Sequence, residues 1–237
     1  MPRHDAKLAV ITGASKGIGA SIAKELAEAG YYVLLLARSA EGLAQVANYL
    51  QAEGLQASGL PVDLTKPEQI DQAVKAVENL GKDVSVLVHN AGIAKVGKAA
   101  DMKLSDWQDV INLNLTAPFY LTQKLLPKMK EGSQIIMINS IGGKQAFAEW
   151  GAYSASKFGS RGFAEALRAE VEDKGIRVTS IYPAAVDTPI HDGLPYNWDR
   201  EKMMKADDVA RAVLYCLKQG PKVRINDIEL ENTAGRF

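Results

Sequence analysis

Short apolar runs recur along the chain and alternate with longer stretches in which apolar residues follow helical spacing. Continuous apolar runs predict strands that are buried on both faces, as in a parallel sheet. The expected strands are residues 7–12, 31–37, 60–63, 84–89, 134–139, 177–182 and 224–230, of which 60–63 has the weakest pattern. The expected helices are residues 17–30, 41–53, 67–81, 105–130, 152–174 and 206–219.

The regular alternation of strand and helix predicts an α/β fold. Parallel strands joined by right-handed helical crossovers build a Rossmann-type doubly wound sheet, here of about seven strands. No linker or shift in composition marks a boundary, so residues 1–237 are expected to form a single domain. The long irregular stretch 183–205 follows the sixth expected strand, where the loops of such sheets line the ligand crevice. Residues 188–205 are therefore predicted to form a substrate lid.

Composition and charge narrow the classes of partner. The 28 basic residues balance 28 acidic ones, which gives no electrostatic reason to expect a nucleic acid or an anionic membrane as partner. No apolar run approaches the roughly 18 residues that a membrane helix needs. The single cysteine, Cys216, cannot form an internal disulfide and no leader pattern is present, so a cytoplasmic location is expected. The three histidines lack metal-ligand spacing, so no metal site is predicted.

A glycine-rich segment, TGASKGIGAS, joins the first expected strand to the first expected helix. Glycines there permit a tight turn and let backbone amides and the helix N-terminus approach a pyrophosphate. Gly13, Gly17 and Gly19 are therefore predicted to form a dinucleotide-binding loop. The same letters contain Gly-x-Ser-x-Gly around Ser15, the pattern of a hydrolase nucleophile elbow. Only one strand precedes Ser15 and only His191 lies late enough to be its base, so a serine hydrolase remains a remote alternative.

The end of the second strand indicates which dinucleotide would bind. A carboxylate at this point contacts the ribose 2′-hydroxyl of NAD, whereas a nearby arginine accommodates the 2′-phosphate of NADP. Here the strand ends in Arg38-Ser39, and Lys16 adds a second cation from the glycine loop. Glu41, three residues further on, is a mild objection. These residues favour NADP(H) over NAD(H) as the cofactor.

Taken together, the motifs resemble those of the short-chain dehydrogenase/reductase family over nearly the whole chain. The matching segments are the glycine loop at 12–19, Asp63 after the third strand, His89-Asn90-Ala91-Gly92, Asn114 in NLNLTAPF, Ser140, the pair Tyr153 and Lys157, and Pro183 with Val186-Asp187-Thr188. The resemblance implies catalytic roles for Asn114, Ser140, Tyr153 and Lys157. It also implies, with the charge argument above, a cofactor site formed by Gly13, Ser15, Lys16, Gly17, Ile18, Gly19, Arg38, Ser39, Asp63, Leu64, Asn90, Ala91, Gly92, Tyr153, Lys157, Pro183, Val186 and Thr188.

The implied activity is hydride transfer between a nicotinamide and a carbonyl or alcohol. Tyr153 would donate the proton and Ser140 a hydrogen bond to the carbonyl oxygen. Tyr153 and Lys157 are four residues apart and share a helix face, so the ammonium is expected to lower the pKa of the phenol. Lys157 would also bind the nicotinamide ribose, and Asn114 would hold a water that links Lys157 to solvent. A second possibility is a non-catalytic NADP(H) sensor, which the presence of all four residues disfavours.

One position departs from the family pattern, and the substrate is the least specified feature. Ala184 follows Pro183 where the family usually has glycine, which raises the question of its backbone conformation. Aromatic and apolar side chains beside the catalytic group or in the lid predict a pocket for an apolar or aromatic ketone. They are Ile141, Phe147, Trp150, Tyr196, Trp198 and Met203.

Two further expectations come from relatives within the family. The alternative activity is a 3-oxoacyl-thioester (acyl-carrier-protein) reductase, which the absence of a glycine-rich stretch in 218–230 disfavours. Family members are commonly tetramers built through the two long helices, which here are expected at 105–130 and 152–174. The resemblance therefore implies a homo-oligomer, a tetramer or a dimer.

Overall fold

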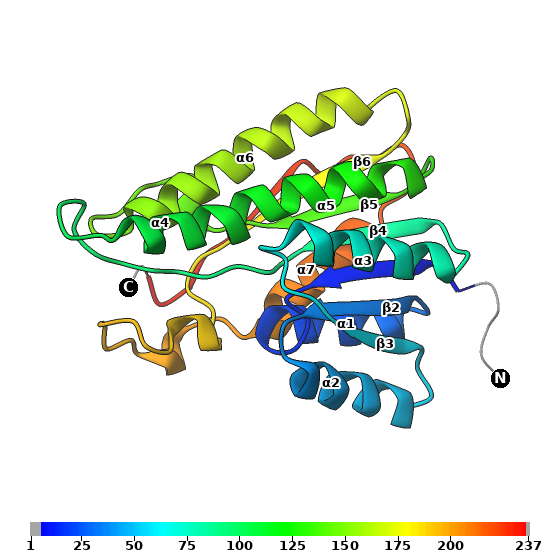
Figure 1. Cartoon of the computed structure of the whole chain (residues 1–237), viewed down its shortest axis with the longest axis horizontal. Coiled ribbons are helices and arrows are strands. Elements are labelled where there is room, and N and C mark those ends of the chain that lie inside the picture. The colour runs from blue at the N-terminus through cyan, green and yellow to red at the C-terminus, as the bar shows by residue number, and fades with distance from the viewer. Residues whose placement is uncertain (1–5, 236–237) are drawn as a thin grey trace.

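Seven parallel strands form one sheet in the computed structural model, which describes residues 6–235. They lie in the order β3-β2-β1-β4-β5-β6-β7 (Figure 1). The strands are β1 Leu8–Thr12, β2 Tyr32–Ala37, β3 Ala57–Pro61, β4 Val84–His89, β5 Gln134–Ile138, β6 Arg177–Pro183 and β7 Asp227–Leu230. The expected α/β doubly wound sheet in a single domain is therefore confirmed.

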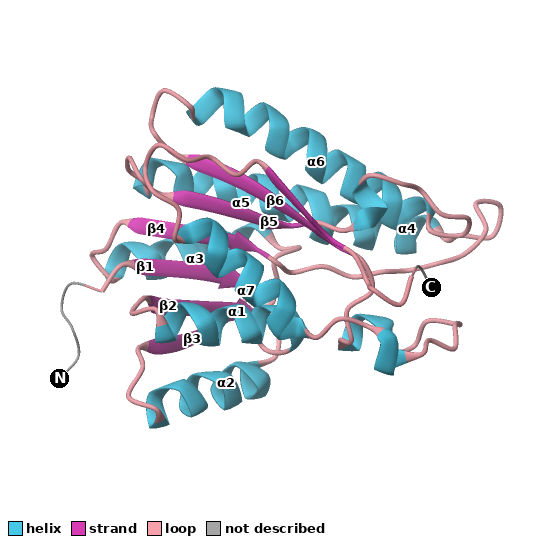
Figure 2. Cartoon of the chain, turned by 180° about the vertical axis from the view of Figure 1, so that it is seen from behind, coloured by secondary structure: helices cyan, strands magenta, loops and turns pink. Residues whose placement is uncertain are grey.

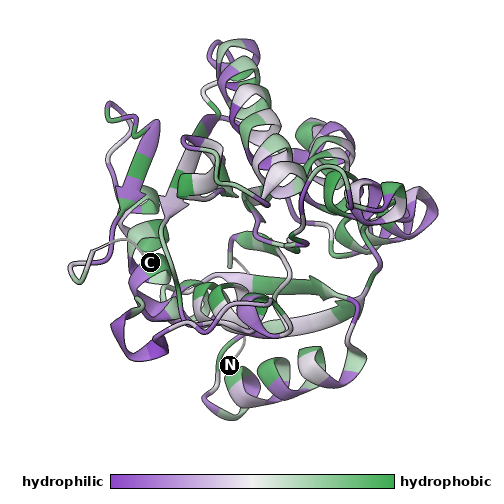
Figure 3. Ribbon diagram, turned by 90° about the vertical axis from the view of Figure 1, so that its left-hand side faces the viewer, coloured by the Kyte–Doolittle hydropathy of each residue, from purple (hydrophilic) through white to green (hydrophobic). Residues whose placement is uncertain are grey.

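Helices cover both faces of the sheet (Figure 2). The helices are α1 Gly17–Glu28, α2 Ala40–Ala52, α3 Pro67–Asn79, α4 Leu104–Ile111, α5 Ala117–Leu125, α6 Gly151–Val171 and α7 Ala206–Leu217. Side chains alternate along each strand, so Ala9 and Ile11 of β1 pack with α1, α2 and α7, while Leu8 and Val10 pack with α3, α5 and α6. Each helix is striped with apolar and polar residues, as a helix that packs one side on a sheet requires (Figure 3).

The third strand lies earlier than predicted. Residues 60–63 were expected, whereas β3 spans Ala57–Pro61 and pairs with β2 from Val33↔Ala57 onward. Its small residues weaken the apolar pattern, but they suit an edge strand beneath a closely packed helix. A Cβ atom at Gly59 would lie 2.9 Å from Leu43 Cβ of α2, so glycine allows this contact.

Two other elements also differ from the prediction. The single helix expected over 105–130 is divided into four helical segments: α4, a π-helical turn at Asn112–Thr116, α5, and a short 3₁₀ turn at Leu126–Lys128. π-Helical turns are often found at functional sites. The last strand is shorter than 224–230 and begins at Asp227.

The order of the strands reverses between β1 and β4, which are neighbours in the sheet. In doubly wound sheets the loops at such a switch point diverge and leave a crevice at the carboxyl ends of the strands. The irregular segment after β6 lies beyond these ends, on the left in yellow and orange in Figure 1. It contains two short 3₁₀ turns, Pro189–His191 and Arg200–Lys202.

Candidate functional site

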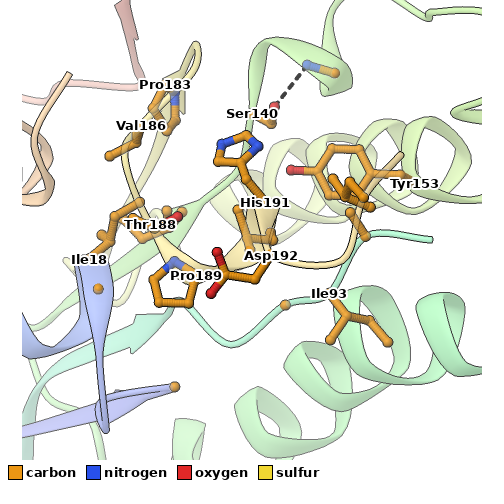
Figure 4. A pocket seen from close by; sticks show the side chains of 18 of the residues that line it. Ile18, Ile93, Ser140, Tyr153, Pro183, Val186, Thr188, Pro189, His191 and Asp192 are labelled. Atoms are coloured by element: carbon orange, nitrogen blue, oxygen red, sulfur yellow. Dashed lines mark hydrogen bonds between the residues drawn. The ribbon is translucent and has the colours of Figure 1, made fainter. Parts of the chain in front are cut away.

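A cavity of about 1260 Å³ lies at the carboxyl ends of the strands, over the switch point (Figure 4). Its wall is formed by the loops that follow β1 to β6 and by residues from 188–199. Ligand sites are commonly about 300 to 1,000 Å³, so this cavity can hold an elongated ligand beside a smaller one. It brings together the predicted residues Gly13, Ser15, Lys16, Gly17, Ile18, Arg38, Ser39, Asp63, Leu64, Asn90, Ala91, Gly92, Ser140, Ile141, Phe147, Trp150, Tyr153, Lys157, Pro183, Val186, Thr188, Tyr196 and Trp198.

The glycine loop is held by close backbone packing. Gly13 and Gly17 adopt positive φ angles of 65° and 57°, a region that other residues rarely occupy. A Cβ atom at Gly19 would lie 2.4 Å from the Gly13 carbonyl oxygen and 2.5 Å from Asn90 Nδ2. Gly19 therefore does not line the cavity; it lets α1 approach the turn that does.

Asn90 connects the glycine loop to the loop after β4. Its Nδ2 donates to the carbonyl oxygens of Thr12, at 2.9 Å, and Gly13, at 3.1 Å. Its backbone N–H donates to Thr12 Oγ1 at 2.9 Å. The loops on both sides of the switch point therefore form one unit, with the N-terminus of α1 facing the cavity.

Arg38 and Lys16 are exposed cations in the wall near the end of β2. Asp63 lies close to Arg38, and its carboxylate accepts from Thr65 N–H at 3.0 Å and Thr65 Oγ1 at 2.7 Å. Burial raises the pKa of Asp63, but the Thr65 hydrogen bonds and the charges of Arg38 and Lys66 outweigh it and lower that pKa. Asp63 is thus an ionised group, two residues beyond the strand it was expected to end.

Ser39 has a structural contact in addition to its place in the wall. Its Oγ accepts from the Gly42 backbone N–H at 3.0 Å and caps the N-terminus of α2.

Ser140 follows β5 and faces Tyr153 of α6. Its Oγ accepts from the Gly142 backbone N–H at 3.0 Å, the bond drawn as a dashed line in Figure 4. Its hydroxyl proton is therefore free to be donated. Asn139 fixes the position of this strand end, because Nδ2 donates to the Lys157 carbonyl at 3.1 Å and Oδ1 accepts from Ser140 N–H at 2.9 Å.

Lys157 is buried, with 7% of its surface exposed, beside Tyr153. Its Nζ donates to the Ile138 carbonyl at 3.0 Å and lies 5.6 Å from the centre of the Tyr153 ring. Burial lowers the pKa of Lys157 to about 8.

The expected lowering of the Tyr153 pKa by Lys157 is wrong. Burial raises the pKa of Tyr153, and the nearby Ser140 hydroxyl lowers it by a smaller amount. The physical reason is that the phenol is buried, so the cost of desolvating its charged form is the largest contribution. The phenol is therefore protonated near neutral pH.

Asn114 lies in the π-helical turn and does not line the cavity. Its Oδ1 accepts from Ile93 N–H at 2.9 Å, and its Nδ2 donates to the Ile93 carbonyl at 2.9 Å and to Ser156 Oγ at 3.1 Å. The side-chain amide thus fixes the loop after β4 to α6. Its role in holding a water that links Lys157 to solvent stays a prediction.

The segment after β6 passes over the glycine loop. Thr188 Cγ2 would be 3.4 Å from a Cβ atom at Gly17, so the two stretches are in close contact. Val186 is buried and pairs with Met204 in an isolated β-bridge. Among the described residues other than glycine, Glu149 alone has a positive φ, so Ala184 fits this turn without strain; its N–H donates to the Leu230 carbonyl at 2.8 Å.

A row of rings runs from the catalytic candidate into the irregular segment. Trp150 meets Tyr153 edge to face, with centroids 5.3 Å apart, and stacks on Tyr196 at 6.1 Å with an interplanar angle of 11°. Tyr196 and Trp198 are 5.4 Å apart, and Trp198 and His191 are 5.3 Å apart. These rings give the outer part of the cavity an aromatic wall.

Met203 was predicted to line the pocket, but it does not. Its side chain is buried, with 4% exposed, and it is absent from the cavity wall. The 3₁₀ turn before it, Arg200–Lys202, turns this residue toward the protein interior.

Four residues of functional interest were not assigned to the cofactor or substrate site from the sequence. Asn139 is described above, and His191 points into the cavity from the irregular segment (Figure 4). Glu149 accepts from the Tyr196 hydroxyl at 3.0 Å while its backbone has a φ of 67°. Asn232, distant in sequence, donates to the carbonyl oxygens of Ala185 and Lys202 at 3.0 and 3.2 Å.

The alternatives considered from the sequence find little geometric support. His89 is buried, and its Nε2 is 2.7 Å from Thr122 Oγ1 of α5, so it cannot serve Ser15. Among residues 6–235, no group of three or more His, Cys, Asp or Glu side chains is placed to hold a metal ion. In the same part of the chain, no helix has the length and apolar character needed to cross a membrane.

Comparison with known proteins agrees with this geometry. The sequence model for short chain dehydrogenases matches residues 7–197. An uncharacterized oxidoreductase of Staphylococcus aureus (strain USA300) is 35% identical over 224 residues, covering 94% of this chain and 95% of the relative. A similar oxidoreductase of Staphylococcus saprophyticus is 33% identical over 226 residues, covering 94% and 95%.

Solved structures show the same similarity. An alcohol dehydrogenase from the archaeon Thermococcus sibiricus, in complex with 5-hydroxy-NADP, has a TM-score of 0.91 at 29% identity and covers 98% of this chain and 99% of its own. A variant of actinorhodin polyketide ketoreductase with NADPH has a TM-score of 0.89 at 30% identity, with 100% of both chains covered. A Burkholderia cenocepacia short chain dehydrogenase with NADP has a TM-score of 0.87 at 30% identity, covering 95% and 96%.

Proposed function

The chain belongs to the short chain dehydrogenase family, and we propose that it is an NADP(H)-dependent oxidoreductase that reversibly reduces a ketone to a secondary alcohol. One observation carries the proposal: Ser140 and Tyr153 face one another beside buried Lys157, inside a cavity that continues to the glycine loop. A proton donor, a second hydrogen-bond donor and a cation thus converge where a substrate carbonyl can bind.

Tyr153 is assigned the role of general acid. Burial keeps its phenol protonated near neutral pH, which is the form that can donate a proton to a developing alkoxide. Ser140 receives a hydrogen bond from Gly142, so its own proton can be directed at the same oxygen. Lys157, buried on the same face of α6, is assigned to the nicotinamide ribose hydroxyls.

The residues present fit a dinucleotide. The turns at Gly13 and Gly17, which have positive φ angles, bring backbone to the cavity wall, and the N-terminus of α1 faces the cavity and favours a pyrophosphate. When bound, the nicotinamide would supply or accept the hydride. Val186 and Thr188 are assigned to its carboxamide, and the other predicted cofactor residues that line the cavity are proposed to contact the dinucleotide.

NADP(H) is the favoured form of the cofactor. Arg38 and Lys16 place two positive charges at the end of β2, where a ribose 2′-phosphate would lie. The ionised Asp63 is near Arg38, but its carboxylate accepts its hydrogen bonds from Thr65, so both cations are left for the phosphate. Three of the structures similar to this chain are complexes with NADP, NADPH or an NADP derivative, which supports the same choice.

The substrate we favour is an apolar or aromatic ketone, bound between Trp150 and the aromatic residues of 188–205, which we propose form a lid. A 3-oxoacyl-thioester reductase is the alternative. Comparing kcat/KM for an acetoacetyl thioester and for simple aryl ketones, with NADPH, distinguishes the two. A preference for the aryl ketones is expected; a preference for the thioester or for polyhydroxylated ketones would contradict it.

Tyr153→Phe tests the proposed function directly. The substitution keeps the ring against Trp150 but removes the acid, so kcat/KM should fall by about 10²- to 10⁴-fold. The dissociation constant for NADPH, measured by fluorescence, should stay nearly the same. Substantial residual turnover would exclude Tyr153 as the acid. If the intact protein binds NADPH but reduces no ketone, the alternative of a non-catalytic NADP(H) sensor would be favoured.

We further propose a cytoplasmic homo-oligomer assembled through α4, α5 and the adjoining face of α6. Leu104, Trp107, Phe119 and Phe158 on these helices are 78%, 38%, 46% and 41% exposed, which is unusual for large apolar side chains gathered on neighbouring elements. Trp107→Glu should shift the chain toward monomer in sedimentation experiments. Tyr215→Glu, a similar change on exposed α7 in the other layer, should not, and equal behaviour of both variants would count against this face.

A further inference from the structure

Two polar atoms in the proposed lid are buried without a partner. His191 Nδ1 and Trp198 Nε1 make no hydrogen bond within the described part of the chain. Both residues line the cavity, and their ring centroids are 5.3 Å apart. Buried polar atoms in proteins nearly always have a hydrogen-bond partner, so two unpartnered atoms on residues that line one cavity indicate a site for a ligand group.

The two atoms offer different chemistry. The indole N–H of Trp198 can only donate. A neutral imidazole has one donor and one acceptor nitrogen, so His191 Nδ1 is an acceptor when the proton is on Nε2. A donor next to an acceptor matches a hydroxyl group, which accepts one hydrogen bond and donates one.

The surroundings favour a neutral group over an anion. Burial and the nearby charge of Arg200 lower the pKa of His191, so the ring is neutral near pH 7. The Arg200 guanidinium is itself paired with Asp187 and Asp192. A substrate carboxylate would therefore meet carboxylates and an arginine that is already engaged.

The pair is on the substrate side of the cavity. The row of rings from Trp198 through Tyr196 and Trp150 leads to Tyr153. Figure 4 shows the His191 ring turned inward from the lid, on the side where Ser140 and Tyr153 lie. A substrate that fills the aromatic part of the cavity would thus extend from the reacting carbonyl toward this pair.

We propose that His191 and Trp198 together bind a hydroxyl group of the substrate, so that the preferred substrates are aromatic ketones carrying a hydroxyl group away from the reacting carbonyl. This inference rests on the proposed function. It adds a specificity-determining pair to the catalytic group and narrows the class of ketone.

Three matched ketones test the proposal: an aryl methyl ketone, the same ketone with a ring hydroxyl, and its methoxy counterpart, which can accept but not donate. With NADPH, the intact protein should show a kcat/KM at least about tenfold higher for the hydroxylated ketone than for the other two. Trp198→Phe and His191→Phe, each of which keeps a ring, should reduce this ratio to about two or below. Lys202→Ala is the control: it lies in the lid with an exposed side chain outside the cavity wall, and should keep the full ratio.

The outcomes separate the inference from the function on which it rests. Equal kcat/KM for the three ketones, or a ratio unchanged in both ring variants, would overturn the pair while leaving ketone reduction standing. If no ketone is reduced, dissociation constants for the same three compounds, measured by calorimetry, decide the matter. Tighter binding of the hydroxylated compound that is lost in the two variants would retain the pair; equal binding would reject it.

Discussion

The glycine loop and the proposed lid line the same cavity but are held in place differently. The glycine loop is fixed by backbone contacts: Asn90 bonds to two of its carbonyls, and Gly19 packs against Gly13 with no room for a methyl group. The lid, 188–205, is joined to the body by a backbone bridge at Met204, and the rest of it is held by side chains. Asp187 at its base receives Arg200 at 3.5 Å and Lys205 at 3.0 Å, and Tyr196 bonds to Glu149.

The difference teaches where the molecule tolerates change. In the glycine loop, a Cβ atom added at Gly19 would lie 2.4 Å from the Gly13 carbonyl oxygen, so the backbone itself would have to move. A single substitution there is therefore expected to disturb the whole loop. Exposed ion pairs are worth only about 0 to 1 kcal/mol each, so the lid can lose one contact and keep its place. A rigid site suits a cofactor common to a family, and an adjustable cover suits a substrate that differs between its members.

The largest effect is expected from Gly19→Ala. The added methyl group would meet the Gly13 carbonyl and Asn90, so the loop must shift and NADPH binding should weaken by at least about tenfold, with a lowered Tm. Gly162→Ala in α6 is the matched control. A Cβ atom there meets nothing within 4 Å, and alanine favours the helix by roughly 0.5 to 1 kcal/mol, so Tm should stay or rise. Similar NADPH binding by both variants would show that the loop is more adaptable than its packing indicates.

A smaller, selective effect is expected from Arg38→Asp. This exchange leaves the loop backbone alone and replaces a cation by an anion at the 2′-phosphate position, so kcat/KM should shift toward NADH by about 10- to 100-fold. Arg211→Asp, the same charge change on exposed α7, should leave the NADPH to NADH ratio as it is. An unchanged ratio in Arg38→Asp would remove this residue from cofactor selection.

The smallest effect is expected in the lid. Asn232→Ala removes the hydrogen bonds to Ala185 and Lys202, so the lid should close less often and KM for the ketone should rise by about three- to tenfold. The dissociation constant for NADPH should change by less than about twofold. Lys202→Ala, which breaks only an exposed pair with Asp199, should leave KM nearly unaltered. A large loss of NADPH binding in Asn232→Ala would mean that the two regions are not separable.

Much of the fold follows from local patterns. Buried parallel strands produce continuous apolar runs, and the strand order then requires loops to gather at one edge of the sheet. The bounds of edge strand β3 were not predicted correctly, because Gly59 stabilises this strand by leaving space for Leu43. A pattern of apolar residues does not detect such a contact. The π-helical turn at Asn112–Thr116 was missed for a similar reason, since its spacing is that of an ordinary helix.

The candidate site divides in the same way. Motifs of fixed spacing, such as the glycine loop and the Tyr153–Lys157 pair, could be assigned from the sequence because neighbouring residues on one element determine their geometry. The tertiary structure decided what depends on distant segments meeting: the burial that raises the pKa of Tyr153, the inward turn of Met203, and the contact of His191 with Trp198. Burial and packing are properties of the whole fold, and for that reason the sequence by itself determined the chemistry of this protein, while the arrangement of its lid and pocket was decided only in three dimensions.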